Sequence, residues 1–168
     1  MPTEIALQAP LDMHIHFREG AMLDLVAPLT AESFAGGVIM PNLVPPVADL
    51  KRLEWYAGEV RRAVGEHLFE PYMTLFFRNY SAAELASAKD RIIGLKLYPV
   101  GVTTNSEGGV ESMREAEATM AAMQEMGIPL LVHGEEPDGF VMDRESDFLP
   151  TYDDLARKFP RLKIVMEH

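Results

Sequence analysis

Residues that could bind a metal ion lie in a strand-like segment near the N-terminus. Between positions 11 and 18, apolar side chains alternate with polar ones that include His14, His16 and Arg18. Strand side chains alternate between two faces, so His14 and His16 would project from one face, about 7 Å apart. Two such imidazoles can hold one metal ion, and Arg18 on the same face could bind a carboxylate. The alternative is a pair of solvated histidines on an edge strand.

Two further histidines close apolar, strand-like segments. His133 follows the run Leu130–Val132, and His168 ends the run that begins at Lys163, whereas His67 lies between expected elements. A histidine in this position can be a satisfied core residue. Three strands ending in histidine nevertheless favour a shared site, because the C-terminal ends of the strands of a parallel barrel face one mouth.

Lys96 lies inside an otherwise apolar strand-like segment, and lysine is almost never fully buried without a partner. One alternative is an edge strand that leaves Lys96 in water, and another is a Schiff-base lysine acting on a carbonyl substrate. A third is a neutral amine that takes up CO2 to form a carbamate, whose two oxygens can bridge two cations. Those cations would be held by two pairs of histidines, His14 with His16 and His133 with His168.

The elements that must position these residues alternate along the chain. Six short apolar segments are typical of strands, at Leu11–Phe17, Gly37–Leu43, Pro71–Phe77, Ile92–Tyr98, Pro129–His133 and Lys163–His168. Helical periodicity fills the gaps, at Met22–Phe34 with a kink or restart at Pro28, Asp49–Gly65, Ala82–Lys89, Ser112–Gly127 and Tyr152–Phe159.

Several residues are expected to begin or end these helices. Asp49 is an expected N-cap and Gly65 an expected C-cap. Ser112 begins an S-x-x-E capping box, Gly127 should end the same helix, and Thr151 could cap the last helix.

A repeated order in which each strand is followed by a helix indicates a parallel α/β fold, either an open doubly wound sheet or a (β/α)8 TIM-type barrel. No G-x-G-x-x-G or G-x-x-x-x-G-K-[ST] motif follows any of the strand-like segments. The polar residues at the strand ends favour the barrel, of which this chain would supply about the first six strands.

Composition restricts the class of protein. The 168 residues suffice for one domain, and their formal net charge of −11 argues against binding to nucleic acid or to an anionic membrane surface. Cysteine is absent, so any metal must be held by other side chains. Neither a signal peptide nor a membrane span is indicated, which makes the cytoplasm the expected location.

The sequence resembles the amidohydrolase superfamily and, within it, the dihydroorotases found as separate bacterial enzymes. The motifs that carry the resemblance span the chain: H-I-H-F-R-E-G from His14, M-P-N-L-V-P-P from Met40, K-L-Y-P from Lys96, T-T-N-S from Thr103, L-V-H-G-E from Leu131, and Glu167-His168. H-x-H is common to many amidohydrolases, whereas the combination of the next three motifs is much more specific.

The resemblance implies a (β/α)8 barrel that catalyses the reversible cyclisation of N-carbamoyl-L-aspartate to L-dihydroorotate in de novo pyrimidine (UMP) biosynthesis. It implies two Zn2+ per subunit and attack by a hydroxide held between them. The metal ligands would be His14 and His16 on the more buried zinc, His133 and His168 on the second, and Lys96, as N6-carboxylysine, bridging both.

The same resemblance implies how a small-molecule substrate is bound. Arg18 and Asn42 would bind the substrate carboxylate, while Thr103 and Thr104 would lie in a mobile loop at residues 100–109 that closes over it. From the residues alone, this segment could equally be an ordinary connecting loop, and Asn42 could be a turn former at a strand end.

One part of the family pattern has no match in this chain. The proton-shuttling aspartate at the end of strand eight is absent, so no residue here is assigned that catalytic role. Residues 1–168 are therefore expected to be the N-terminal portion of a single barrel domain that lacks strands seven and eight. We expect this portion to be inactive alone and the full-length protein to be a homodimer.

Two other functions fit the residues. Another cyclic amidohydrolase, such as a dihydropyrimidinase or an allantoinase, would share H-x-H and Lys96 but would not need Arg18 and Asn42 to bind a carboxylate. A catalytically inactive homologue could serve as a binding partner, although retention of His14, His16, Lys96, His133 and His168 argues against it.

Overall fold

The computed structural model describes residues 4–110 and 113–167, and within them six strands form one parallel sheet. The strands are β1 (Leu11–Ile15), β2 (Gly36–Ile39), β3 (Glu70–Phe76), β4 (Gly94–Leu97), β5 (Leu130–Val132) and β6 (Ile164–Met166). The helices are α1 (Gly20–Ala31), α2 (Leu50–Val64), α3 (Ala82–Ala88), η1 (Lys89–Arg91), α4 (Met113–Met126), α5 (Arg144–Asp147) and α6 (Leu149–Lys158).

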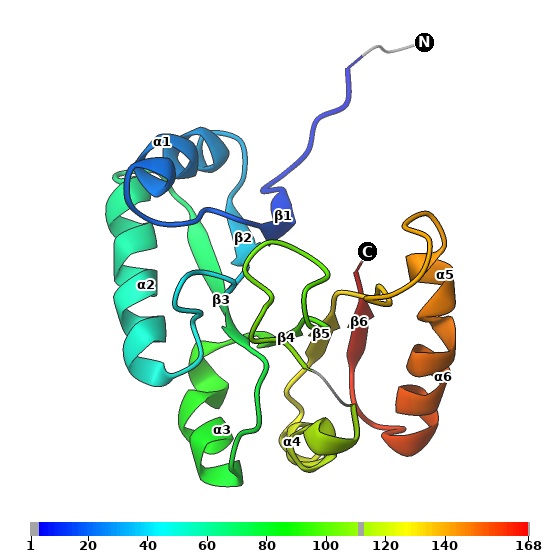
Figure 1. The fold of residues 1–168 in the computed structure, drawn as a ribbon. Coiled ribbons are helices and arrows are strands. Elements are labelled where there is room, and N and C mark those ends of the chain that lie inside the picture. Colours follow the sequence, from blue (N-terminus) through cyan, green and yellow to red (C-terminus); the bar gives the residue numbers. More distant parts are fainter. Residues whose placement is uncertain (1–3, 111–112, 168) are drawn as a thin grey trace.

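The strands follow one another in the sheet in chain order, β1-β2-β3-β4-β5-β6. A doubly wound sheet instead reverses its strand order at a switch point, so this topology excludes it and confirms the barrel-type alternative. The sheet curls into half of a barrel, and the helices lie around its outside (Figure 1).

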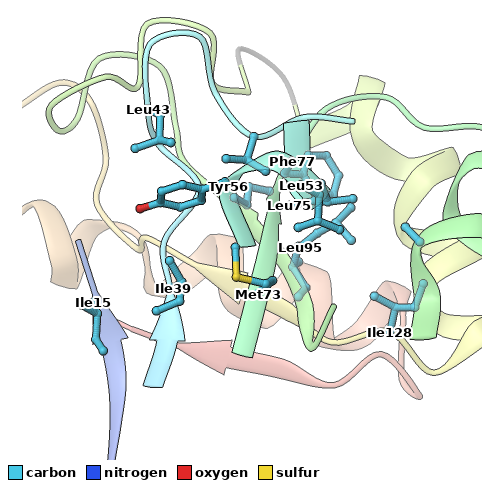
Figure 2. Close-up of a cluster of buried hydrophobic side chains, with 14 of the residues drawn as sticks. Ile15, Ile39, Leu43, Leu53, Tyr56, Met73, Leu75, Phe77, Leu95 and Ile128 are labelled. Carbon is cyan, nitrogen blue, oxygen red and sulfur yellow. The ribbon is translucent and has the colours of Figure 1, made fainter. Parts of the chain in front are cut away.

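Period-two alternation gives the sheet two different faces. One face packs against the helices, and residues such as Ile15, Ile39 and Leu95 belong to the main hydrophobic core there (Figure 2). Val132 belongs to the same core. The neighbouring positions point to the concave side, where Val38, Met40 and Leu131 form a second, small apolar cluster. His14 and Lys96 occupy alternate positions in β1 and β4, so they also face the concave side.

The expected helix ends are mostly confirmed. The Asp49 carboxylate accepts a hydrogen bond from the Arg52 backbone N–H at 2.8 Å and so caps α2. Gly65 and Gly127 both adopt positive φ, of 62° and 69°, at the points where α2 and α4 end. Ser112 lies outside the described residues, so its capping box stays a prediction.

Two expectations about helices are corrected. Thr151 does not cap the last helix, because α6 begins at Leu149 and Pro150 occupies its first turn, where a fixed φ and a missing N–H are tolerated. Pro28 does not restart α1, which is assigned as one helix through that residue.

The two edge strands expose apolar side chains. Leu11 and Met13 of β1 are 45% and 64% exposed, and Val165 and Met166 of β6 are 44% and 66% exposed. Such edges normally pair or are covered in a soluble protein. None of the helices in the described ranges is long and apolar enough to cross a membrane.

Candidate metal-binding active site

The predicted site residues gather at the C-terminal ends of the strands. His14 lies in β1 and His16 directly follows that strand. Lys96 lies in β4, and His133 directly follows β5. Parallel pairing in register aligns these strand ends, as the pairing of Lys96 with Leu131 shows. Alternation along each strand then directs the polar side chains to the concave side.

His14 and His16 face each other directly. Their Nε2 atoms are 2.9 Å apart and their ring centroids 4.8 Å apart, while His16 Nδ1 hydrogen-bonds the buried Asn42 side-chain oxygen at 2.9 Å. Desolvation lowers the pKa of His16 to about 4, and the nearby His14 and Arg18 act in the same direction. The lowered pKa favours the neutral imidazole of His16, which is the form that binds metal ions.

Lys96 is completely buried and its ammonium group contacts the carboxylate of Glu167, the residue after β6. The same carboxylate lies 3.2 Å from His14 Nδ1. Burial lowers the pKa of Lys96, although Glu167 opposes that shift. Burial alone would raise the pKa of Glu167, but its hydrogen bond with His14 and its contact with Lys96 outweigh this and lower it.

His133 follows β5, the strand that pairs with β4, and has a carboxylate partner of its own. Its Nε2 atom is 2.9 Å from a Glu135 carboxylate oxygen, and burial lowers the pKa of His133 although Glu135 opposes the shift. Tyr98 packs between these groups, with its ring centroid 5.9 Å from the His133 ring and 5.0 Å from Lys96 Nζ.

Arg18, Asn42 and the loop after β4 form a connected polar cluster. Arg18 Nη1 donates to the backbone oxygen of Asn42 at 3.2 Å, and Asn105 Nδ2 donates to the same oxygen at 3.1 Å. The Asn42 side chain donates to the Thr104 backbone oxygen at 2.8 Å. The loop is itself held by Ser106, whose buried hydroxyl donates to the Thr103 carbonyl and accepts from the Thr103 N–H.

The structure therefore brings together most of the residues predicted from sequence. Five of them lie in contact with one another or share a neighbour: His14, His16, Lys96, Arg18 and Asn42. His133 packs against Tyr98, whose ring also lies near Lys96. Thr103 and Thr104 belong to the cluster through their backbone atoms. His168 lies outside the described residues, so its role stays a prediction.

Three contacts were not predicted from the sequence. Glu167 and Glu135 appeared in the sequence analysis only as members of the quoted motifs, yet they contact Lys96 and His133. The Asn105 side chain donates to the Asn42 backbone oxygen, whereas substrate binding in this loop was assigned from the sequence to Thr103 and Thr104, and Asn105 was given no role. The only sequence signal for the two glutamates was their position beside a strand-end histidine.

The donor chemistry fits a divalent cation such as zinc. No group of three His, Cys, Asp or Glu side chains in residues 4–110 and 113–167 is arranged closely enough to hold a metal. The facing Nε2 atoms of His14 and His16 nevertheless form a two-nitrogen donor pair. Lys96 could complete it only as an anion such as a carbamate, since an ammonium group cannot bind a cation.

Comparisons with known proteins agree with this geometry. The family model described as Amidohydrolase matches residues 11–168. A protein named dihydroorotase from Cupriavidus metallidurans is 43% identical over 175 residues, which cover 100% of this chain and 51% of the relative. The chain thus spans about half the length of the curated relatives it matches.

Solved structures give the same result. A crystal structure of dihydroorotase from Campylobacter jejuni has a TM-score of 0.92 and 52% identity, covering 98% of this chain and 51% of that chain. Dihydroorotase from Saccharomyces cerevisiae in complex with 5-fluoroorotic acid has a TM-score of 0.87 and 35% identity, covering 95% of this chain and 47% of that chain.

Proposed function

Because the chain belongs to the amidohydrolase family, we propose that it carries the N-terminal half of a dihydroorotase active site. The reaction is the reversible cyclisation of N-carbamoyl-L-aspartate to L-dihydroorotate in pyrimidine synthesis. The relatives named dihydroorotase support this assignment. The observation that carries it is Lys96, a fully buried lysine beside His14 and Glu167 at the end of β4.

We propose that Lys96 functions as its carbamate and that two Zn2+ ions are bound per subunit. Desolvation favours the neutral amine, which is the form that reacts with CO2. The carbamate and Glu167 would both be anions in a buried site, and such like charges require a cation nearby. His14, His16, Lys96, His133 and His168 would hold the metals, which when bound activate water and polarise the amide carbonyl.

Arg18 and Asn42 support a substrate that carries a carboxylate. The guanidinium of Arg18 can donate two parallel hydrogen bonds to a carboxylate and lies beside the buried Asn42. The loop of residues 100–109 is hydrogen-bonded to Asn42 through Thr104 and Asn105, so it covers that side of the site and limits access of water. This arrangement favours dihydroorotate over hydantoin or allantoin.

We also propose that the barrel and the site are completed by sequence that lies outside these 168 residues. The exposed apolar edges of β1 and β6 and the coverage of about half of each relative support this division. The proton-transferring aspartate belongs to that remaining part. The 168 residues alone should therefore bind metal weakly and show little or no turnover.

A substrate comparison on the full-length protein tests the proposal. Dihydroorotate should be hydrolysed, seen as loss of its ultraviolet absorbance, while hydantoin and allantoin should be hydrolysed far more slowly. Arg18→Ala should raise KM for dihydroorotate far more than it changes zinc content. Arg157→Ala, which removes an exposed arginine of α6, is the control and should leave KM unchanged. Preference for hydantoin or allantoin, or a normal KM in Arg18→Ala, would reject this substrate.

Metal analysis tests the role of Lys96 separately. The full-length wild-type protein should contain about two zinc ions per chain, and Lys96→Met in the full-length protein should lose most of them. Lys158→Met is the matched control, because Lys158 is a half-exposed lysine that also pairs with a carboxylate, that of Glu117. An unchanged zinc content in Lys96→Met, or equal loss in both variants, would contradict the bridging role.

A further inference from the structure

The backbone at Arg18 has an unusual conformation. Arg18 has a φ of 61°, in the left-handed region that non-glycine residues seldom adopt, and Gly20 two residues later has a φ of 60°. Residues held in this region persist only where the surrounding structure fixes them, and they cluster at ligand-binding sites. The direction of the Arg18 side chain therefore depends on what holds this turn.

Helix α2 holds the turn through two side chains that lie one helical turn apart. The Tyr56 hydroxyl donates to the backbone oxygen of Arg18 at 2.9 Å. Arg52 Nη2 lies 2.7 Å from a Glu19 carboxylate oxygen and its guanidinium stacks on Trp55 at 4.1 Å. The chain is thus held at two successive residues, and the first of them is Arg18.

Tyr56 is itself rigidly placed. The side chain is fully buried in the main core, with Leu53 on the same helix, and Figure 2 shows its hydroxyl directed away from Leu53 and Leu75. A ring fixed by packing on all sides presents its hydroxyl at a defined position. The core between α2 and the sheet therefore sets the position of the Arg18 backbone.

We propose that Tyr56 is a positioning residue for recognition of the substrate carboxylate, acting through Arg18. Its hydroxyl keeps the Arg18 backbone in the left-handed conformation, and that conformation directs the guanidinium toward the Asn42 backbone oxygen, 3.2 Å from Nη1. The inference rests on the proposed function for the identity of the ligand. The contacts themselves do not depend on it.

Loss of the hydroxyl should act on binding more than on chemistry. In Tyr56→Phe the ring still fills the core, but the partly buried Arg18 oxygen loses its donor and the turn can relax toward ordinary φ values. The guanidinium then leaves the geometry suited to bidentate binding. One hydrogen bond of this kind corresponds to an increase of about two- to tenfold in KM for dihydroorotate. The kcat value should change by less than about twofold, because Arg18 binds a part of the substrate that does not react.

Steady-state kinetics with the full-length metal-loaded enzyme tests the proposal, with Tyr80→Phe as the matched control. Tyr80 is also buried, and its hydroxyl also donates to backbone oxygens, those of Ala48 and Phe76, but it does not contact Arg18. The expected result is a raised KM in Tyr56→Phe and an unchanged KM in Tyr80→Phe. In an Arg18→Ala background, Tyr56→Phe should have no further effect on kcat/KM.

Three results would overturn the proposal: an unchanged KM in Tyr56→Phe, an equal rise in Tyr80→Phe, or an effect that persists in Arg18→Ala. If the wild-type enzyme does not act on dihydroorotate at all, it is the proposed function that fails. The crystal structure of Tyr56→Phe then decides the inference. Departure of Arg18 from positive φ supports it, and an unchanged Arg18 refutes it.

Discussion

Two buried tyrosines should respond in opposite directions when each loses its hydroxyl group. Tyr98 is 1% exposed, and its phenolic oxygen is buried with no hydrogen-bond partner within the described part of the chain. Tyr80 is 7% exposed, and its hydroxyl donates to the Phe76 oxygen at 2.8 Å and to the Ala48 oxygen at 3.0 Å. Tyr→Phe at both positions removes the same atom from a packed environment, so only the hydrogen bonding differs.

The magnitudes follow from these contacts. Burial of an unpaired hydroxyl destabilises the folded state by about 1–3 kcal/mol. Removing it relieves that penalty, while the small void left by the oxygen atom destabilises the fold by only about 0.2 kcal/mol. The Tyr98 ring keeps its stacking on Phe76, whose centroid is 5.3 Å away. Tyr98→Phe should therefore raise the free energy of unfolding by about 1 kcal/mol, whereas Tyr80→Phe should lower it by about 1 kcal/mol.

Urea unfolding followed by far-ultraviolet circular dichroism measures both variants under the same conditions, on protein free of metal and substrate. The expected separation of about 2 kcal/mol exceeds the error of the extrapolation for a small domain. A loss of stability in Tyr98→Phe comparable to that in Tyr80→Phe would refute the reasoning, because it would mean that the Tyr98 hydroxyl has a hydrogen-bond partner in solution.

Two further predictions concern α3 and the loop over the site. The hydrogen bond from Arg78 contributes most to lowering the pKa of Glu84 from 4.5 to about 2, so the stabilisation by this carboxylate is complete above pH 4.5 and is lost as pH falls toward 2. Glu84→Gln should remove that part of the acid-induced loss of stability. Urea titrations between pH 2 and 4.5 measure the effect, and a pH profile of stability identical to that of the wild type would contradict the prediction. Gly109→Ala should raise KM for dihydroorotate, because an added Cβ would overlap the Tyr98 backbone oxygen and displace the loop, whereas a Cβ on Gly108 would meet nothing within 4 Å. Equal KM values in the two loop variants would show that the loop adapts.

The fold could be predicted largely from local pattern. Period-two alternation around Lys96, with Leu95 and Leu97 in the core, is enough to direct the lysine to the opposite face of the sheet. The absence of nucleotide-binding motifs and the strand-end histidines favoured a barrel, and the sequential strand order confirms it. Apart from β3, whose length was predicted correctly, strand lengths were overestimated, because a strand ends where its ladder pairing ends and an apolar run can continue beyond that point.

The contacts within the site were less predictable because they depend on distances between side chains far apart in the chain. The Lys96–Glu167 contact joins residues 71 positions apart, and the position of Glu167 beside a strand-end histidine does not by itself predict a contact with Lys96. Tyr56 likewise fits an ordinary core position on α2, with helical spacing to Leu53 and Val60. Its hydrogen bond to Arg18 follows only from how α2 packs against the end of β1.

The pairing of charges within the site has a consequence for how strongly it can bind metal. The four proposed ligands within the described residues already have partners in the chain: His14 contacts His16, Lys96 contacts Glu167, and His133 contacts Glu135. A bound cation would have to replace these contacts, so the measured metal affinity is the difference between the ligand bonds gained and the pairs lost. The proposed carboxylation of Lys96 would change this balance, because it would turn the attraction to Glu167 into repulsion that a bound cation relieves. Metal binding should therefore strengthen with dissolved CO2, and bicarbonate-depleted buffer should lower zinc content before it lowers the stability of the fold.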